Sequence, residues 1–78
     1  MKFANNGKTT VCGQWTSEMK THFKVSVAIC SDNDKFNKKK GKRIAENRMI
    51  WQFFIVLPAN HDLIGLKEQL KDFLYVNC

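Results

Sequence analysis

The sequence predicts a small α+β domain, with a three-stranded sheet and about two helices packed on one face, in the order β-β-α-β-α. Three observations predict this fold. Residues 21–30 alternate between apolar and polar types, as a half-buried strand does. Residues 50–57 are apolar on both faces, which favours a central strand covered on both sides. The segment that ends at Leu74 has apolar residues at helical spacing.

The chain has 78 residues, so we expect one domain over 1–78, with residues 1–7 as a flexible polar lead-in. Residues 8–15 contain strand-favouring types and should form a hairpin with 21–30. A helix can follow over 35–47, although Gly41 in its middle costs about 1 kcal/mol, so a shorter helix after Gly41 is an alternative. The step from this helix to 50–57 allows either a parallel crossover or an antiparallel return. Asn60 can cap the closing helix, with Asp62 in its first turn.

The positive charge of the chain is concentrated in one segment. The formal net charge is +6, and residues 35–48 alone carry seven Lys or Arg against Glu46, which is also +6. The segments before and after this one have net charges of +1 and −1. A local basic patch of this kind points to a polyanionic partner rather than to a generally basic protein.

Clustered cations bind nucleic-acid phosphates without any base contact, because binding releases condensed counterions. We therefore predict a nucleic-acid-binding site, RNA favoured over DNA because a lysine-rich patch lacks the bidentate guanine contacts typical of Arg. The alternatives are an acidic protein surface as the partner, or a solvated surface that keeps a small protein soluble. The phosphate-binding residues would be Lys38, Lys39, Lys40, Lys42, Arg43 and Arg48, with Lys35, Phe36 and Asn37 as auxiliary residues and Phe36 as a candidate for base stacking.

The stretch from Val25 to Arg48 also carries a family resemblance. It joins a strand to the run Asp34-Lys35-Phe36-Asn37-Lys38-Lys39-Lys40-Gly41-Lys42-Arg43-Ile44-Ala45-Glu46-Asn47-Arg48. This stretch resembles a segment of small bacteriophage accessory proteins, which act in host takeover or against host defences. The resemblance implies a compact protein of the infected cell's cytoplasm that acts on host or defence machinery, for example as an RNA-binding inhibitor of a toxin–antitoxin system or as a protein-binding inhibitor.

Catalytic and metal sites have little support in the sequence. The two His and three Cys residues lack the spacing of a zinc site, and the carboxylates fit caps, turns and a wet helix face. We therefore predict no enzyme activity, no metal and no cofactor.

The start of the chain turns polar too soon for an export signal, and no apolar run reaches the roughly 20 residues of a membrane span. These features predict a cytoplasmic protein with reduced thiols and no membrane partner. The long apolar strand and the small size of the domain allow a homodimer or a higher oligomer.

Overall fold

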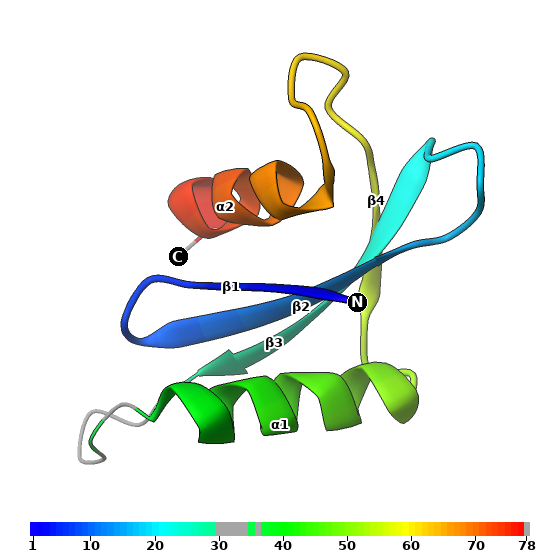
Figure 1. Ribbon diagram of the computed structural model, residues 1–78. Coiled ribbons are helices and arrows are strands. Elements are labelled where there is room, and N and C mark those ends of the chain that lie inside the picture. The colour runs from blue at the N-terminus through cyan, green and yellow to red at the C-terminus, as the bar shows by residue number, and fades with distance from the viewer. Residues whose placement is uncertain (30–34, 36, 78) are drawn as a thin grey trace.

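The computed structural model describes residues 1–29, 35 and 37–77 of the chain. Within these residues the elements are β1 (Lys2–Asn5), β2 (Thr9–Trp15), β3 (His22–Ile29), α1 (Lys38–Ile50), β4 (Ile55–Pro58) and α2 (Leu66–Asn77) (Figure 1). The strands form a sheet in the order β1-β2-β3-β4, and every neighbouring pair is antiparallel. The predicted α+β class is confirmed, and α1 joins β3 to β4 by an antiparallel return.

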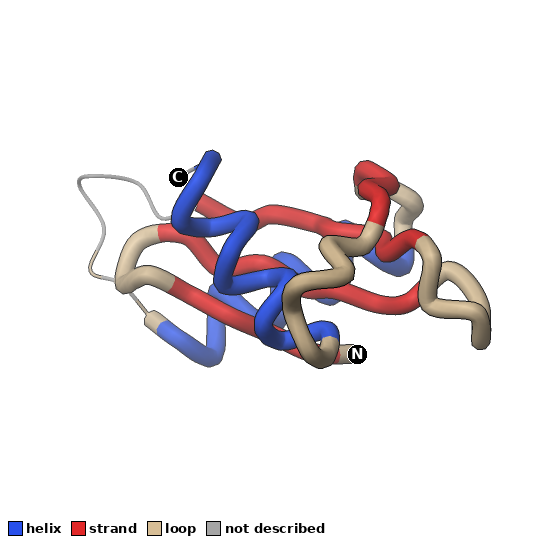
Figure 2. Tube along the Cα trace, turned by 90° about the horizontal axis from the view of Figure 1, so that it is seen from above, coloured by secondary structure: helices blue, strands red, loops and turns tan. Residues whose placement is uncertain are grey.

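The two helices cover opposite faces of the sheet, with α2 above the strands and α1 below them in Figure 1 and with α2 in front in Figure 2. Successive residues of a strand point to opposite faces, so β2 contributes to both cores. Val11 packs with Leu70 of α2, whereas Cys12 packs with Ala45 and Met49 of α1. The prediction that both helices share one face is wrong.

The sheet face that α1 covers is buried because its side chains are small. Ser26 and Ala28 of β3 belong to the face that the alternation predicts to be wetter, yet both are buried. The Ser26 hydroxyl donates a 2.6 Å hydrogen bond to the carbonyl of Ala45 in α1, so its polar atom is satisfied inside the protein. A strand face of small and polar residues can therefore be covered by a helix, although the alternation of apolar and polar residues predicts that this face is exposed.

The sheet has four strands because β1 forms where a flexible lead-in is predicted. β1 pairs with β2 from Lys2, which lies opposite Gly13. Ala4 is buried on the α2 side, and Phe3 packs against the cluster on the α1 side. Phe3 and Ala4 are consecutive, so this short segment shows no alternation that would predict a strand. β1 is held instead by packing against the two clusters that contain residues of α2 and α1.

The helix α1 begins before Gly41, so the predicted alternative of a shorter helix is wrong. Asn37 is the N-cap, and its side-chain oxygen accepts a 3.1 Å hydrogen bond from the amide of Lys40. A Cβ atom at position 41 would lie only 2.4 Å from Oγ1 of Thr10. The glycine therefore lets α1 approach the sheet closely.

The apolar run 50–57 does not form a central strand. Ile50 is the last residue of α1, and β4 begins only at Ile55. β4 pairs with β3 and lies at the edge, so the side chains of Ile55 and Val56 are 50% and 51% exposed. The prediction is wrong because Ile50 belongs to α1, residues 51–54 form the turn and the loop that follow it, and no described residue forms a strand beyond β4.

The closing helix begins at Leu66, later than a cap at Asn60 predicts. Asn60 instead starts a turn, and its side-chain oxygen accepts from the amide of Asp62 at 3.0 Å. The buried Gln69 holds this turn on α2, because its Oε1 accepts from the amide of Asn60 at 2.9 Å and its Nε2 donates to the Asn60 carbonyl at 2.8 Å. The segment before α2 is thus an ordered turn tied to the helix.

Candidate functional site

The predicted phosphate-binding residues all lie on α1. Lys38, Lys39, Lys40, Lys42, Arg43 and Arg48 are exposed, and in the described part of the chain none of them forms an ion pair. Lys35 is exposed in the segment before the helix, and Asn37 is its N-cap. Phe36, the predicted stacking residue, lies outside the described residues.

The first turn of α1 has an unfavourable distribution of charge. It contains Lys38, Lys39 and Lys40 and no acidic residue, while a basic residue, Arg48, lies in the last turn. A helix N-terminus carries a partial positive charge of roughly half an elementary charge and favours anions there. The three lysines add to this positive potential, which an anionic ligand would relieve.

The lysines of α1 meet those of α2 at the edge formed by β1. A groove of about 190 Å³ is lined by Lys38 and Lys42 of α1 and by Lys67 and Lys71 of α2. Its other described lining residues are Phe3, Ala4, Asn5 and Thr10, so no carboxylate of the described residues lines it. We call this the lysine groove.

Two side-chain arrangements shape the lysine groove. The ammonium group of Lys42 lies 5.6 Å from the centre of the Phe3 ring, which is cation–π geometry. On α2, Lys71 lies 3.6 Å from Glu68, and both side chains are more than half exposed, so this pair neutralises the groove only weakly. Lys67 precedes Lys71 by four residues and therefore lies on the same face of the helix.

Lys67 and Lys71 are functional candidates that the sequence does not reveal. Their spacing in an amphipathic segment predicts an ordinary solvated helix face, and they lie 19 and 23 residues after Arg48, where the basic segment ends. They join the α1 cations because β1 is an edge strand and the helices on its two faces both reach that edge.

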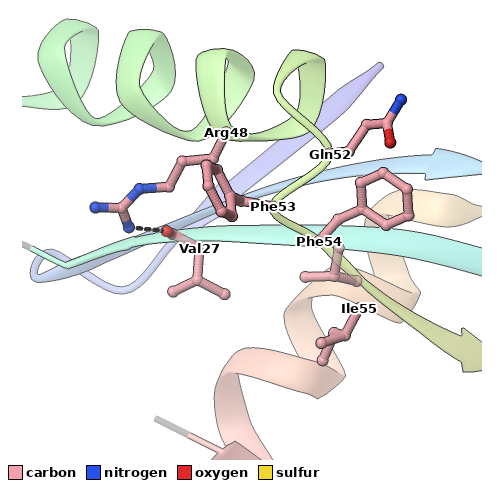
Figure 3. Close-up of a pocket in the computed structure, with 7 residues that line it drawn as sticks. Val27, Arg48, Gln52, Phe53, Phe54 and Ile55 are labelled. Atoms are coloured by element: carbon pink, nitrogen blue, oxygen red, sulfur yellow. Dashed lines mark hydrogen bonds between the residues drawn. The ribbon is translucent and has the colours of Figure 1, made fainter.

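Arg48 lies apart from the lysine groove, on the side of α1 that faces β3 and β4. Its Nη1 donates a hydrogen bond to the carbonyl of Val27, on the part of β3 that extends beyond its pairing with β4 (Figure 3). The same region contains a second groove of about 550 Å³, lined by Val25, Val27, Arg48, Gln52, Phe53, Phe54 and Ile55. We call this the aromatic groove.

The remaining reactive groups do not converge. No three His, Cys, Asp or Glu side chains of the described residues lie close enough together to hold a metal ion. Cys12 is buried and free, and burial is the main cause that raises the pKa of its thiol above the usual value of 9.0. Such a thiol stays protonated at neutral pH, which makes it a poor nucleophile. None of the described helices has the length and apolar character needed to cross a bilayer.

Comparison of the chain with protein-family models, with curated proteins and with solved structures found no match.

Proposed function

We propose that this protein binds nucleic acid, RNA in preference to DNA, through the exposed cations of α1 and the lysine groove. The observation that supports the proposal most is that four lysines from two helices line one groove, and that none of its described lining residues is a carboxylate. Like charges brought together repel each other, so a fold that gathers them is stabilised when an anion occupies the groove.

The chemistry of the site favours contact with phosphates over recognition of bases. A lysine ammonium is a point charge on a flexible stem, whereas specific guanine contacts depend on the planar fork of Arg. The first six residues of α1, from Lys38 to Arg43, include four lysines and one arginine, and all five side chains are exposed. We therefore propose loosely specific binding whose affinity comes from counterion release.

We also propose an accessory role in a phage-infected cell, acting on host or defence machinery. This proposal rests on the resemblance of the basic segment to bacteriophage accessory proteins. Its test is co-purification from infected host cells with and without nuclease. Partners that disappear after nuclease treatment support the nucleic-acid role, whereas partners that remain would assign the basic surface to an acidic protein.

The binding proposal is tested by fluorescence anisotropy with a labelled RNA at about 50 to 200 mM salt. Affinity should fall steeply over this range, because each phosphate contact contributes about 0.7 to 0.9 to the slope of log K against log salt. The variant Lys67→Gln should bind more weakly and lose about one such contact from the slope.

Lys20→Gln is the matched control, since it removes the same charge from an exposed lysine in the turn between β2 and β3, at the opposite end of β2 from Thr10. It should leave the slope unchanged. If Lys67→Gln and Lys20→Gln lost equal RNA affinity, net charge alone would account for binding. A wild-type affinity that does not change with salt would refute the proposal.

A further inference from the structure

The aromatic groove is an exposed apolar surface at one end of the basic helix. The side chain of Phe53 in this groove is 69% exposed, and that of the neighbouring Trp51 is 66% exposed. Figure 3 shows Phe53, Phe54 and Ile55 following the end of α1, with Arg48 on the helix. Phe53 is part of a contiguous apolar lining together with Val25, Val27, Phe54 and Ile55, and a contiguous exposed apolar patch of this kind marks a binding site more often than a single exposed side chain does.

The way in which α1 ends puts Phe53 and Arg48 in the same groove. The backbone amide of Phe53 donates a hydrogen bond to the carbonyl of Arg48 at 2.8 Å, and the backbone amide of Gln52 donates one to the carbonyl of Met49 at 3.1 Å. These two bonds form a Schellman motif, which brings the residue after the turn back over the last helical turn. Gln52 adopts the left-handed conformation, with φ of 66°, at the position where glycine is favoured. A strained residue that lines a groove is consistent with a functional role.

The hydrogen bond of Arg48 decides which kind of ligand the groove favours. The free edge of β3 could in principle accept another strand, but Arg48 already donates to the carbonyl of Val27. A peptide strand would have to displace this arginine, which caps the edge as charged side chains often do. The bond also holds the guanidinium plane in place, and no other described residue accepts a hydrogen bond from this guanidinium, so its remaining donors can serve a ligand.

We propose that the aromatic groove takes the bases of a single-stranded nucleic acid whose phosphates lie along α1. The proposal deepens the proposed function and rests on it. Lys40, Ile44 and Arg48 are spaced by four residues, so they lie on the same face of α1 and lead from its lysine-rich end to the groove. The 13 residues of α1 span about 20 Å, which accommodates several nucleotides.

The groove offers what an unpaired base requires. The exposed ring of Phe53 is a surface for stacking, which every base can use. The Arg48 guanidinium and the Gln52 amide can donate hydrogen bonds to base edges. A duplex keeps its bases stacked and paired, so it can contact the lysines but cannot fill the aromatic groove. The groove thus distinguishes a single strand from a duplex.

The test compares a labelled single-stranded RNA of about ten nucleotides with an abasic strand of equal length and with a duplex, all by anisotropy. The wild-type protein should bind the base-containing strand roughly 5- to 150-fold more tightly than the abasic strand, which has the same phosphates. Phe53→Ala should remove this difference while leaving the salt dependence unchanged. The abasic comparison uses wild-type protein, so it does not depend on the folding of a variant.

Tyr75→Ala is the matched control, because it removes an aromatic side chain that is 90% exposed on α2, outside the aromatic groove. It should preserve the preference for bases. If the wild-type protein bound the base-containing and the abasic strand with equal affinity, this inference would be overturned and the charge-based proposal would stand. If the protein bound neither strand, or bound both with an affinity independent of salt, the proposed function itself would be refuted. A peptide of alternating Glu and Val residues tests the competing role of the groove, the addition of a strand to β3. Binding of this peptide that is lost in Phe53→Ala and is not displaced by the RNA would assign the groove to strand addition and overturn the inference.

Discussion

At the residue scale, Gly41 shows how packing can decide a position that helix propensity disfavours. Glycine inside a helix costs about 1 kcal/mol relative to alanine, and this cost favours a helix that starts later. The close approach of α1 to β2 outweighs that cost, because any Cβ atom at position 41 would contact the Thr10 hydroxyl oxygen at 2.4 Å. Among the described residues the same oxygen is buried and has no hydrogen-bond partner, and a Cβ atom this close would require either α1 or Thr10 to move.

Gly41→Ala should therefore lower the free energy of unfolding by about 1 to 2 kcal/mol, despite the higher helix propensity of alanine. The measurement is urea denaturation followed by circular dichroism. Arg43→Ala, at an exposed position of the same helix outside the lysine groove, should change stability by less than about 0.5 kcal/mol. A Gly41→Ala protein as stable as the wild type would show that α1 can move away from Thr10 at little cost.

At the element scale, both ends of α1 depart from what a stable helix prefers. Its first turn has three lysines where acidic residues are favoured, and its C-terminal turn has Gln52 where glycine is favoured. Local rules that fail at both ends of one element are typical of a functional surface rather than of a structural one. Stability and binding should therefore respond in opposite directions to substitutions there.

Lys39→Glu should raise the free energy of unfolding by about 0.5 to 1 kcal/mol at low salt, because the carboxylate interacts favourably with the helix N-terminus. It should also weaken RNA binding, because it reverses a charge in the proposed interface. Lys39 is exposed, so no packing is lost. Lys39→Gln should give an intermediate result in both measurements, and a Lys39→Glu protein that is less stable at low salt would contradict this account of α1.

At the scale of the whole molecule, the fold brings together charges that are separate in the sequence. The chain has a net charge of +6. Lysines of α1 and lysines of α2 lie around the same groove at the β1 edge of the sheet. Repulsion within such a cluster acts over roughly 30 Å at about 0.01 M salt and only about 8 Å at 0.15 M. Salt should therefore stabilise this protein through screening.

The Tm should rise when NaCl is increased from about 10 to about 150 mM, as measured by differential scanning calorimetry. The double variant Lys38→Gln, Lys67→Gln should have a higher Tm at low salt and should gain less from added salt. If the variant and the wild-type protein responded equally to salt, the repulsion would lie elsewhere than in the lysine groove.

Local patterns determined much of this protein. The alternation in β3, the strand-favouring residues of β2 and the cationic segment that became α1 are each contained in a short stretch, so neighbouring residues were enough to predict them. The cations of α1 could be predicted as a binding site for the same reason, because they are close together in the sequence.

The tertiary structure alone decided where these parts meet. The formation of β1, the burial of Ser26 and Ala28 beneath α1, the edge position of β4 and the approach of Lys67 to Lys38 all depend on contacts between segments distant in sequence. Such contacts follow from how two helices and four strands bury their small and apolar faces together, and no local pattern contains that information. The charge was therefore predictable from the sequence, whereas the two grooves that would use it exist only in the folded protein.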